Sequence, residues 1–198
     1  MQKRVLYLMM FLMVILMSCQ NKKETTPPKV KKAKSVAAKV VTVQPLMKSL
    51  NPDFKVQITD VFTAYNNLKD ALVASDSVTV LKATKATIKA LDKVDKSLLK
   101  RPASQNIWET DKPLLKKQLN KLVTIKSLAQ QRQEFLDLSK NMIHLVESFG
   151  VNQKVMVQFC PMEDDFKGGY WLSTEAAIKN PYFGSKMLTC GSTKKIIN

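Results

Sequence analysis

Four sulfur-bearing side chains near the C-terminus are the residues of this chain best suited to chemistry. Cys160 and Met162 form a Cys-x-Met sequence, and Met187 and Cys190 form a Met-x-x-Cys sequence about thirty residues further on. Thiolates and thioethers are soft donors, which favour soft ions such as Cu(I). The four sulfurs therefore predict a site for Cu(I) or a related soft metal ion.

The same two cysteines are also suited to a disulfide. An oxidising compartment permits such a bond, and a Cys160–Cys190 bridge would stabilise the fold by about 3–4 kcal/mol in the chain-entropy model. In this alternative Met162 and Met187 pack in the core. A redox-responsive site would pass between the two forms, so the sequence leaves both interpretations open.

The remaining reactive side chains give little support for catalysis. His144, the single histidine, falls on a predicted helix that ends about ten residues before Cys160, which makes it a possible additional metal ligand. One histidine does not assemble a Ser-His-Asp or Cys-His set, and the chain has no glycine-rich phosphate loop and no C-x-x-C pair. We therefore expect a protein that is not an enzyme.

The N-terminus predicts export and lipidation. Lys3 and Arg4 precede an apolar run of about thirteen residues, too short to span a membrane and typical of a signal peptide over residues 1–18. The run ends in Leu-Met-Ser-Cys, which resembles the lipobox of bacterial lipoproteins and implies acylation of Cys19. A plain secretory signal or an uncleaved anchor is the alternative. We expect a cell-envelope protein that faces the periplasm and is held to the inner or outer membrane by a lipid anchor.

Residues 19–50 are predicted to be a disordered tether. They contain three prolines and no aromatic residue, and eight lysines stand against one glutamate. Such a segment buries too little apolar surface to order itself. The basic charge, part of a net +16 for the chain, suits anionic lipid headgroups or simply solvates the tether. Nucleic acid is not expected as a partner in the envelope.

Residues 51–149 have the apolar spacing of four amphipathic helices. Apolar side chains recur three and four positions apart, and Gly150 is a stop signal. Asn51 or Asp53 is suited to cap the first helix, the turn at 74–77 carries the next cap, and Ser104 is suited to cap the third helix. The predicted fold is all-α, an up-down-up-down four-helix bundle. Its predicted core comprises Phe54, Ile58, Leu72, Ile88, Leu119, Phe135, Leu138 and Phe149.

Beyond Gly150 the helical periodicity fails, although the segment is rich in aromatic residues. We expect an irregular C-terminal segment whose Trp171, Tyr182 and Phe183 pack on the bundle, because large aromatic surfaces are rarely left exposed together. Residues 51–198 would then form a single domain with one core.

The C-terminal segment carries four short sequences that resemble the signature of a known family. They are Cys-Pro-Met (160–162), Gly-Tyr-Trp-Leu (169–172), Asn-Pro-Tyr-Phe-Gly (180–184) and Lys-Met-Leu-Thr-Cys-Gly (186–191). The family comprises uncharacterised bacterial envelope domains that are common in Bacteroidetes, and the resemblance covers roughly residues 54–192, including Gln-Arg-Gln-Glu-Phe at 131–135. Related domains are fused to periplasmic adaptor subunits of heavy-metal efflux pumps, which implies copper or a similar ion and efflux components as partners. Cys-Pro-Met is also similar to small heavy-metal-binding domains, in which histidine commonly follows the methionine; here Glu163 follows.

Overall fold

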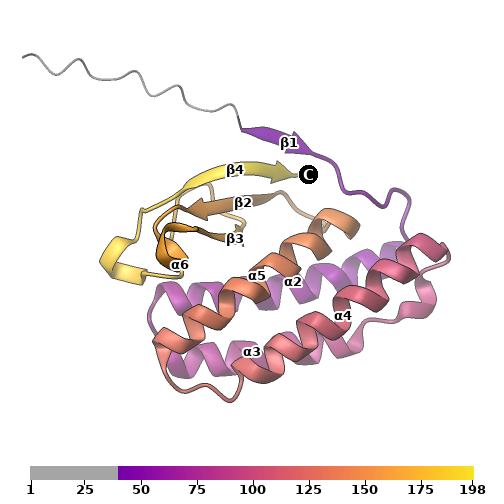
Figure 1. Cartoon of the computed structure of the whole chain (residues 1–198). Helices are drawn as coiled ribbons and strands as arrows, with labels where there is room; N and C mark the ends of the chain where they lie inside the picture. Colours follow the sequence, from indigo (N-terminus) through magenta and orange to yellow (C-terminus); the bar gives the residue numbers. More distant parts are fainter. Residues whose placement is uncertain (1–39) are drawn as a thin grey trace, which may run out of the picture. The chain divides into compact units, whose positions relative to one another are not determined.

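The computed structural model describes residues 40–198, and these residues form two layers (Figure 1). Four long helices make one layer, and a small sheet built largely from the C-terminal third of the chain makes the other. The signal peptide predicted over residues 1–18, Cys19 and the tether as far as residue 39 lie outside the described residues.

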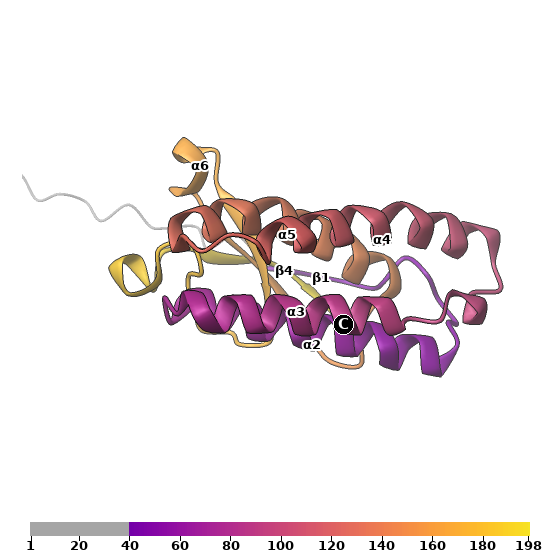
Figure 2. The ribbon, with the colours of Figure 1, turned by 90° about the horizontal axis from the view of Figure 1, so that it is seen from below.

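The four predicted helices are confirmed. They are α2 (Pro52–Val73), α3 (Ser77–Lys93), α4 (Pro102–Leu122) and α5 (Leu128–Phe149), and Figure 2 shows them lying alongside one another. Among residues 40–198, no helix is both long and apolar enough to cross a membrane.

The predicted caps of the first two helices are confirmed: Asn51, and not Asp53, caps the first, and Asp76 of the 74–77 turn caps the second. The Asn51 side chain accepts hydrogen bonds from the first turn of α2, and the Asp76 carboxylate accepts the backbone N–H groups of Val78 and Thr79 at the start of α3. These oxygens satisfy N–H groups that have no partner within the helix. The third cap is wrong: α4 begins at Pro102, and Ser104 lies inside its first turn with its hydroxyl donating to the Arg101 carbonyl oxygen.

The predicted bundle core is also confirmed in its main part. Phe54 lies edge-on to Trp108 and Phe149, with ring centroids 5.8 and 5.2 Å away, an arrangement that aromatic pairs favour. Seven of the eight predicted residues are at most 1% exposed; Ile88 alone is only partly buried, at the margin of the core.

The all-α fold class is wrong, because a four-stranded mixed sheet accompanies the helices. Its strands are β1 (Val41–Val43), β2 (Val155–Cys160), β3 (Gly169–Ser173) and β4 (Ser192–Ile197), in the order β1-β4-β2-β3. Strand β2 pairs antiparallel with β3 and β4, and β1 pairs parallel with β4. Strands β2 and β3 are buried on both faces over much of their length, so they lack the alternation of apolar and polar residues that marks a half-exposed strand.

The start of the folded domain also differs from the prediction. Residues 41–43 belong to the segment predicted to be disordered, yet they form β1, and the Val43 carbonyl oxygen accepts the backbone N–H of Asn198 at 3.2 Å. The backbone N–H groups of Leu46 and Met47 donate to carbonyl oxygens at the end of α5. The domain therefore begins before residue 51, because a strand that is too short to be stable alone gains a partner from the far end of the chain.

The sheet lies against α2 and α5. The Tyr65 hydroxyl on α2 accepts the Leu172 backbone N–H of β3 at 3.2 Å, and Lys195 on β4 pairs with Glu147 on α5 at 2.7 Å. Three short helical turns complete the structure: η1 (Lys96–Leu98), α6 (Glu163–Phe166) and η2 (Gly184–Met187).

Candidate functional site

The fold brings the two predicted cysteines together. Cys160 is the last residue of β2, and Cys190 follows η2 just before β4; their Sγ atoms lie 2.9 Å apart although thirty residues separate them. Both are free thiols. Cys160 is fully buried and Cys190 is half-buried, so one sulfur of the pair is held in the interior and the other lies nearer the surface.

Two glycines lie beside the cysteines where the chain is closely packed. Cys160 is paired across β2 and β3 with Gly169, where a Cβ atom would come within 2.6 Å of the Tyr182 ring. Gly191 has a φ of +140°, and a Cβ atom there would lie 2.8 Å from the Phe159 carbonyl oxygen. Only glycine fits a backbone that passes this close in that conformation. Both glycines therefore serve the close packing of the segments that carry the two cysteines.

The predicted packing of the aromatic tail on the helices is confirmed. Trp171 is fully buried and lies edge-on to Tyr182, whose ring in turn packs against Phe135 of α5 at 5.8 Å. Phe183 is half-buried against the same core. These contacts fasten the segment that carries Cys190 to the helical layer.

The two predicted methionines lie outside the hydrophobic core. Met162 immediately precedes α6 and is 40% exposed. Met187 ends η2 and is half-buried, and its carbonyl oxygen accepts the Cys190 backbone N–H at 3.0 Å. Each thioether thus belongs to a turn that also carries a cysteine, rather than to the packed interior.

His144 is engaged with a carboxylate. Its Nδ1 atom lies 2.8 and 2.9 Å from the two carboxylate oxygens of Asp111, which links α5 to α4. Asp111 is 3% exposed, and burial raises the pKa of its carboxyl group, while the hydrogen bond from His144 opposes that rise. Within residues 40–198, no three His, Cys, Asp or Glu side chains are grouped as a metal site would require. The His144 ring is thus held by Asp111, a contact between two helices that the helical pattern did not predict.

The Cys190 thiol resists ionisation. The hydrogen bond with the Cys160 thiol, together with burial, raises the pKa of Cys190 to about 11. A thiolate is the form that binds a metal or attacks a disulfide. An incoming ion would therefore have to displace a proton from Cys190 at neutral pH.

The acidic sequence 163–165 forms most of the strained turn α6. Asp164, Asp165 and Phe166 all have φ values between 50° and 66°, a left-handed conformation that costs L-residues about 1–2 kcal/mol each. Glu163 is half-buried, and burial raises the pKa of its carboxyl group. Phe166, by contrast, is 77% exposed.

Arg132 is a residue whose role the helical pattern did not reveal. From α5 its Nε donates to the Pro181 carbonyl oxygen at 3.0 Å, and Nη2 donates to the Leu72 carbonyl oxygen at 3.0 Å and to Ser75 Oγ at 2.9 Å. Burial lowers the pKa of the guanidinium. One side chain thereby joins α5, the end of α2 and the C-terminal segment. Arg132 lies in the 131–135 sequence that contributes to the family resemblance.

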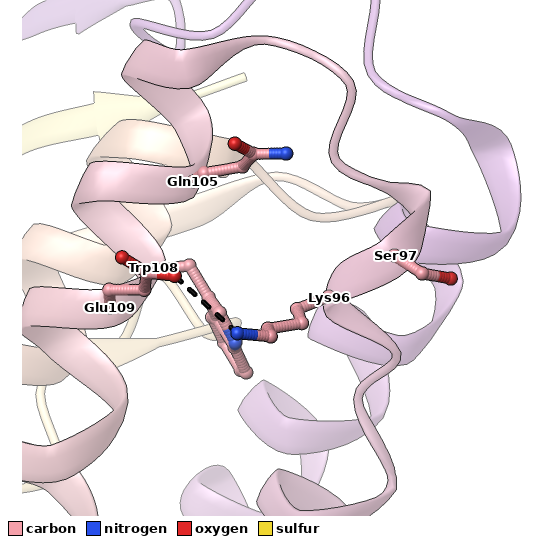
Figure 3. Close-up of a pocket in the computed structure, with 5 residues that line it drawn as sticks. All are labelled: Lys96, Ser97, Gln105, Trp108 and Glu109. Atoms are coloured by element: carbon pink, nitrogen blue, oxygen red, sulfur yellow. Dashed lines mark hydrogen bonds and ion pairs between the residues drawn. The ribbon is translucent and has the colours of Figure 1, made fainter.

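A separate cleft lies between η1 and the start of α4 (Figure 3), with a volume of about 240 Å³. Lys96 and Glu109 face each other across it at 3.4 Å, and the ring of Trp108, almost fully buried, forms its wall. The two charges are exposed and neutralise one another, and the five lining residues include no thiol or histidine. The cleft therefore offers none of the soft donors that the cysteine pair provides.

The fold and the thiol pair define a helical domain completed by a small mixed sheet. Residues 61–154 match a family model described as "Protein of unknown function (DUF3347)". The match begins in α2 and ends just before β2, so it covers the helical layer and stops short of Cys160. No curated protein and no solved structure matches the chain. The match agrees with an uncharacterised domain family for the helical part.

Proposed function

We propose that this protein is an envelope lipoprotein that binds Cu(I) or a related soft metal ion through Cys160 and Cys190, with Met162 and Met187 as further donors. The observation that carries the proposal is the 2.9 Å approach of two free thiols from distant parts of the chain. Both methionines lie outside the core, which leaves their thioethers available.

The spacing of the sulfurs suits an ion after a small movement. Metal–thiolate bonds are about 2.3 Å long, and two of them at a tetrahedral angle place the sulfurs about 3.8 Å apart. The thiols would therefore separate by about 1 Å from their distance of 2.9 Å. Cys190 is half-buried and precedes a loop residue, Gly191, so it is the sulfur better placed to move.

The exposed side of the site suits exchange of the ion. Met162 is 40% exposed and follows the buried Cys160 by two residues, so an ion would meet a thioether at the surface before it meets a buried thiol. Such an arrangement fits a carrier that receives and releases metal. We propose heavy-metal efflux components as the receiving partners, on the basis of the family resemblance.

The cellular setting is part of the same proposal. The Leu-x-small-Cys sequence supports acylation of Cys19, and the lysine-rich tether supports contact with anionic headgroups. A metal-binding domain on a lipid anchor would act at the periplasmic face of a membrane, and it needs no catalytic residues of its own.

A second candidate rests on the same distance. Thiols 2.9 Å apart also need to approach by only about 0.85 Å to reach the disulfide bond length of about 2.05 Å. In that case the protein is a non-catalytic structural or interaction lipoprotein, and the Cys160–Cys190 bridge stabilises its tail. The thiol state of the exported protein separates the two candidates.

The test begins with full-length protein recovered from the periplasm. Thiol labelling and intact mass, before and after reduction, report the state of the pair, and bound metal is counted in the same samples. The reduced chain is then titrated with Cu(I) against a chromophoric chelator. Cys160→Ser and Cys190→Ser should abolish tight binding, and Met162→Leu or Met187→Leu should weaken it.

Met142→Leu is the matched control. Met142 is fully buried on α5, and exchange of Met for Leu in a core is well tolerated, so this variant should bind like the wild type. Metal-free protein that carries a quantitative disulfide after export would favour the structural candidate. Equal Cu(I) affinity in the wild type and in both cysteine variants would refute the copper proposal.

A further inference from the structure

The side chain of Asn180 links the two ends of the loop that carries Cys190. Asn180 is fully buried. Its Oδ1 accepts the backbone N–H groups of Tyr182 and Phe183 at 2.8 and 3.2 Å, and its Nδ2 donates to the Cys190 carbonyl oxygen at 2.9 Å. A single amide thus holds both the turn at 180–183 and the backbone of Cys190.

The backbone of Asn180 strengthens this link. Its N–H donates to the Leu188 carbonyl oxygen at 2.8 Å, and its carbonyl oxygen accepts the Gly184 N–H at 3.0 Å. Both ends of η2 are therefore tied to one residue. Arg132 fixes the neighbouring Pro181 to α5 by a hydrogen bond of 3.0 Å, so the turn that holds Cys190 is itself fastened to the helical layer.

We infer that Asn180 is the positioning residue of the thiol pair: its Nδ2–H···O bond to Cys190 sets the distance between the Cys190 and Cys160 sulfurs. Cys160 lies on β2 and is fixed by strand pairing, whereas Cys190 lies in a loop. The loop residue is the one that needs positioning. The inference deepens the proposed function, since it concerns the same two thiols, but its main readout needs no metal.

The variant Asn180→Asp isolates the hydrogen bond in question. Aspartate keeps an oxygen for the N–H groups of Tyr182 and Phe183, but it replaces the donor with an oxygen that faces the Cys190 carbonyl. Leu119→Ala is the control, because Leu119 is buried in α4 and its truncation weakens the bundle without touching the loop.

The readout is the equilibrium constant for oxidation of the pair by glutathione disulfide. It is measured on the full chain carrying Cys19→Ser, so that only Cys160 and Cys190 react. Two Sγ–H bonds break and one Sγ–Sγ bond forms, and glutathione disulfide takes up two electrons and two protons to give two reduced glutathione molecules. Loss of a positioning hydrogen bond should lower this constant about tenfold in Asn180→Asp. Leu119→Ala should leave it within about twofold while the protein remains folded.

A measurement on the wild type covers the case in which Asn180→Asp does not fold. The side-chain NH₂ protons of Asn180 should exchange with solvent at least about tenfold more slowly than those of Asn67, whose side chain is exposed. Equal exchange rates, or an equal fall of the oxidation constant in Asn180→Asp and Leu119→Ala, would overturn the positioning role. If the wild type binds no Cu(I) but Asn180→Asp still shifts the oxidation constant, the copper proposal fails and the positioning role stands.

Discussion

Replacement of Trp171 by alanine tests how strongly the C-terminal segment is held by the rest of the fold. Trp171 is fully buried between the sheet and the segment that follows it. A buried tryptophan covers about 150–250 Å², which at about 25 cal/mol per Å² corresponds to about 4–6 kcal/mol.

Two effects reduce that figure. Extended-chain areas overstate the surface exposed on unfolding, and the Trp171 indole N–H has no hydrogen-bond partner among the described residues, which costs the native state about 1–3 kcal/mol. We therefore expect Trp171→Ala to lower the free energy of unfolding by about 3–5 kcal/mol, the usual range for this truncation in a core. Trp171→Phe keeps most of the ring and removes the unpaired donor, so it should cost less than about 1.5 kcal/mol.

The assay is urea unfolding of the reduced protein, followed by the circular dichroism of the helices and by the labelling of Cys190. Both probes should give the same midpoint if the sheet and the helices unfold as one unit. A loss below about 1 kcal/mol in Trp171→Ala, with the helical transition unchanged, would show that the tail adds little to the bundle. That result would refute the single-domain interpretation of the sheet and helices.

Three further predictions concern the thiol pair and its supports. Because the pKa of Cys190 is raised to about 11, a metal ion that binds this thiol must displace its proton. The apparent Cu(I) affinity should therefore rise about tenfold per pH unit for each proton released between pH 6 and 8. An affinity that is independent of pH in chelator competition would exclude this thiol as a ligand. Gly191→Ala should destabilise the fold by more than about 1 kcal/mol in urea unfolding, because the φ of Gly191 is +140° and the new Cβ would lie 2.8 Å from a backbone oxygen. An unchanged urea midpoint would contradict this prediction. Arg132→Lys should lower the free energy of unfolding by about 1–3 kcal/mol, since an ammonium does not reproduce the forked donation to Pro181 and Leu72. The thermal midpoint of this variant should fall accordingly. A loss no larger than that of the exposed Lys117→Ala would argue against the role of Arg132.

The helical layer could be predicted from the sequence because its determinants are local. A helix is specified by hydrogen bonds four residues apart and by an apolar stripe with the same period. The spacing of Phe54, Ile58 and Leu72 therefore predicted the buried face of the first helix. The pair Asn51 and Asp53 and the turn at 74–77 indicated where the first two helices begin. The prediction of Ser104 as a helix cap was wrong because this helix begins with a proline at its first position and has no side-chain cap.

The sheet could not be predicted from any short segment of the sequence, because its strands pair across long separations in the chain. Strand β1 has three residues, and its partner β4 begins about 150 residues later, so neither pattern alone indicates the pairing. The bridge from His144 to Asp111 and the three bonds of Arg132 are likewise contacts between distant segments. Such contacts depend on how the layers pack, and packing follows from the whole chain.

At the candidate site, too, some features follow from the sequence and others only from the tertiary structure. The sequence by itself determined which atoms are available: two cysteines in the C-terminal segment and two methionines at short spacing from them. Only the tertiary structure decided that the Cys160 and Cys190 sulfurs meet, at 2.9 Å, because their approach depends on strand pairing at one cysteine and on the Asn180 loop at the other. Residue types fix the chemistry a chain can offer, whereas the distance between two sulfurs thirty residues apart is set by the fold that closes the loop between them.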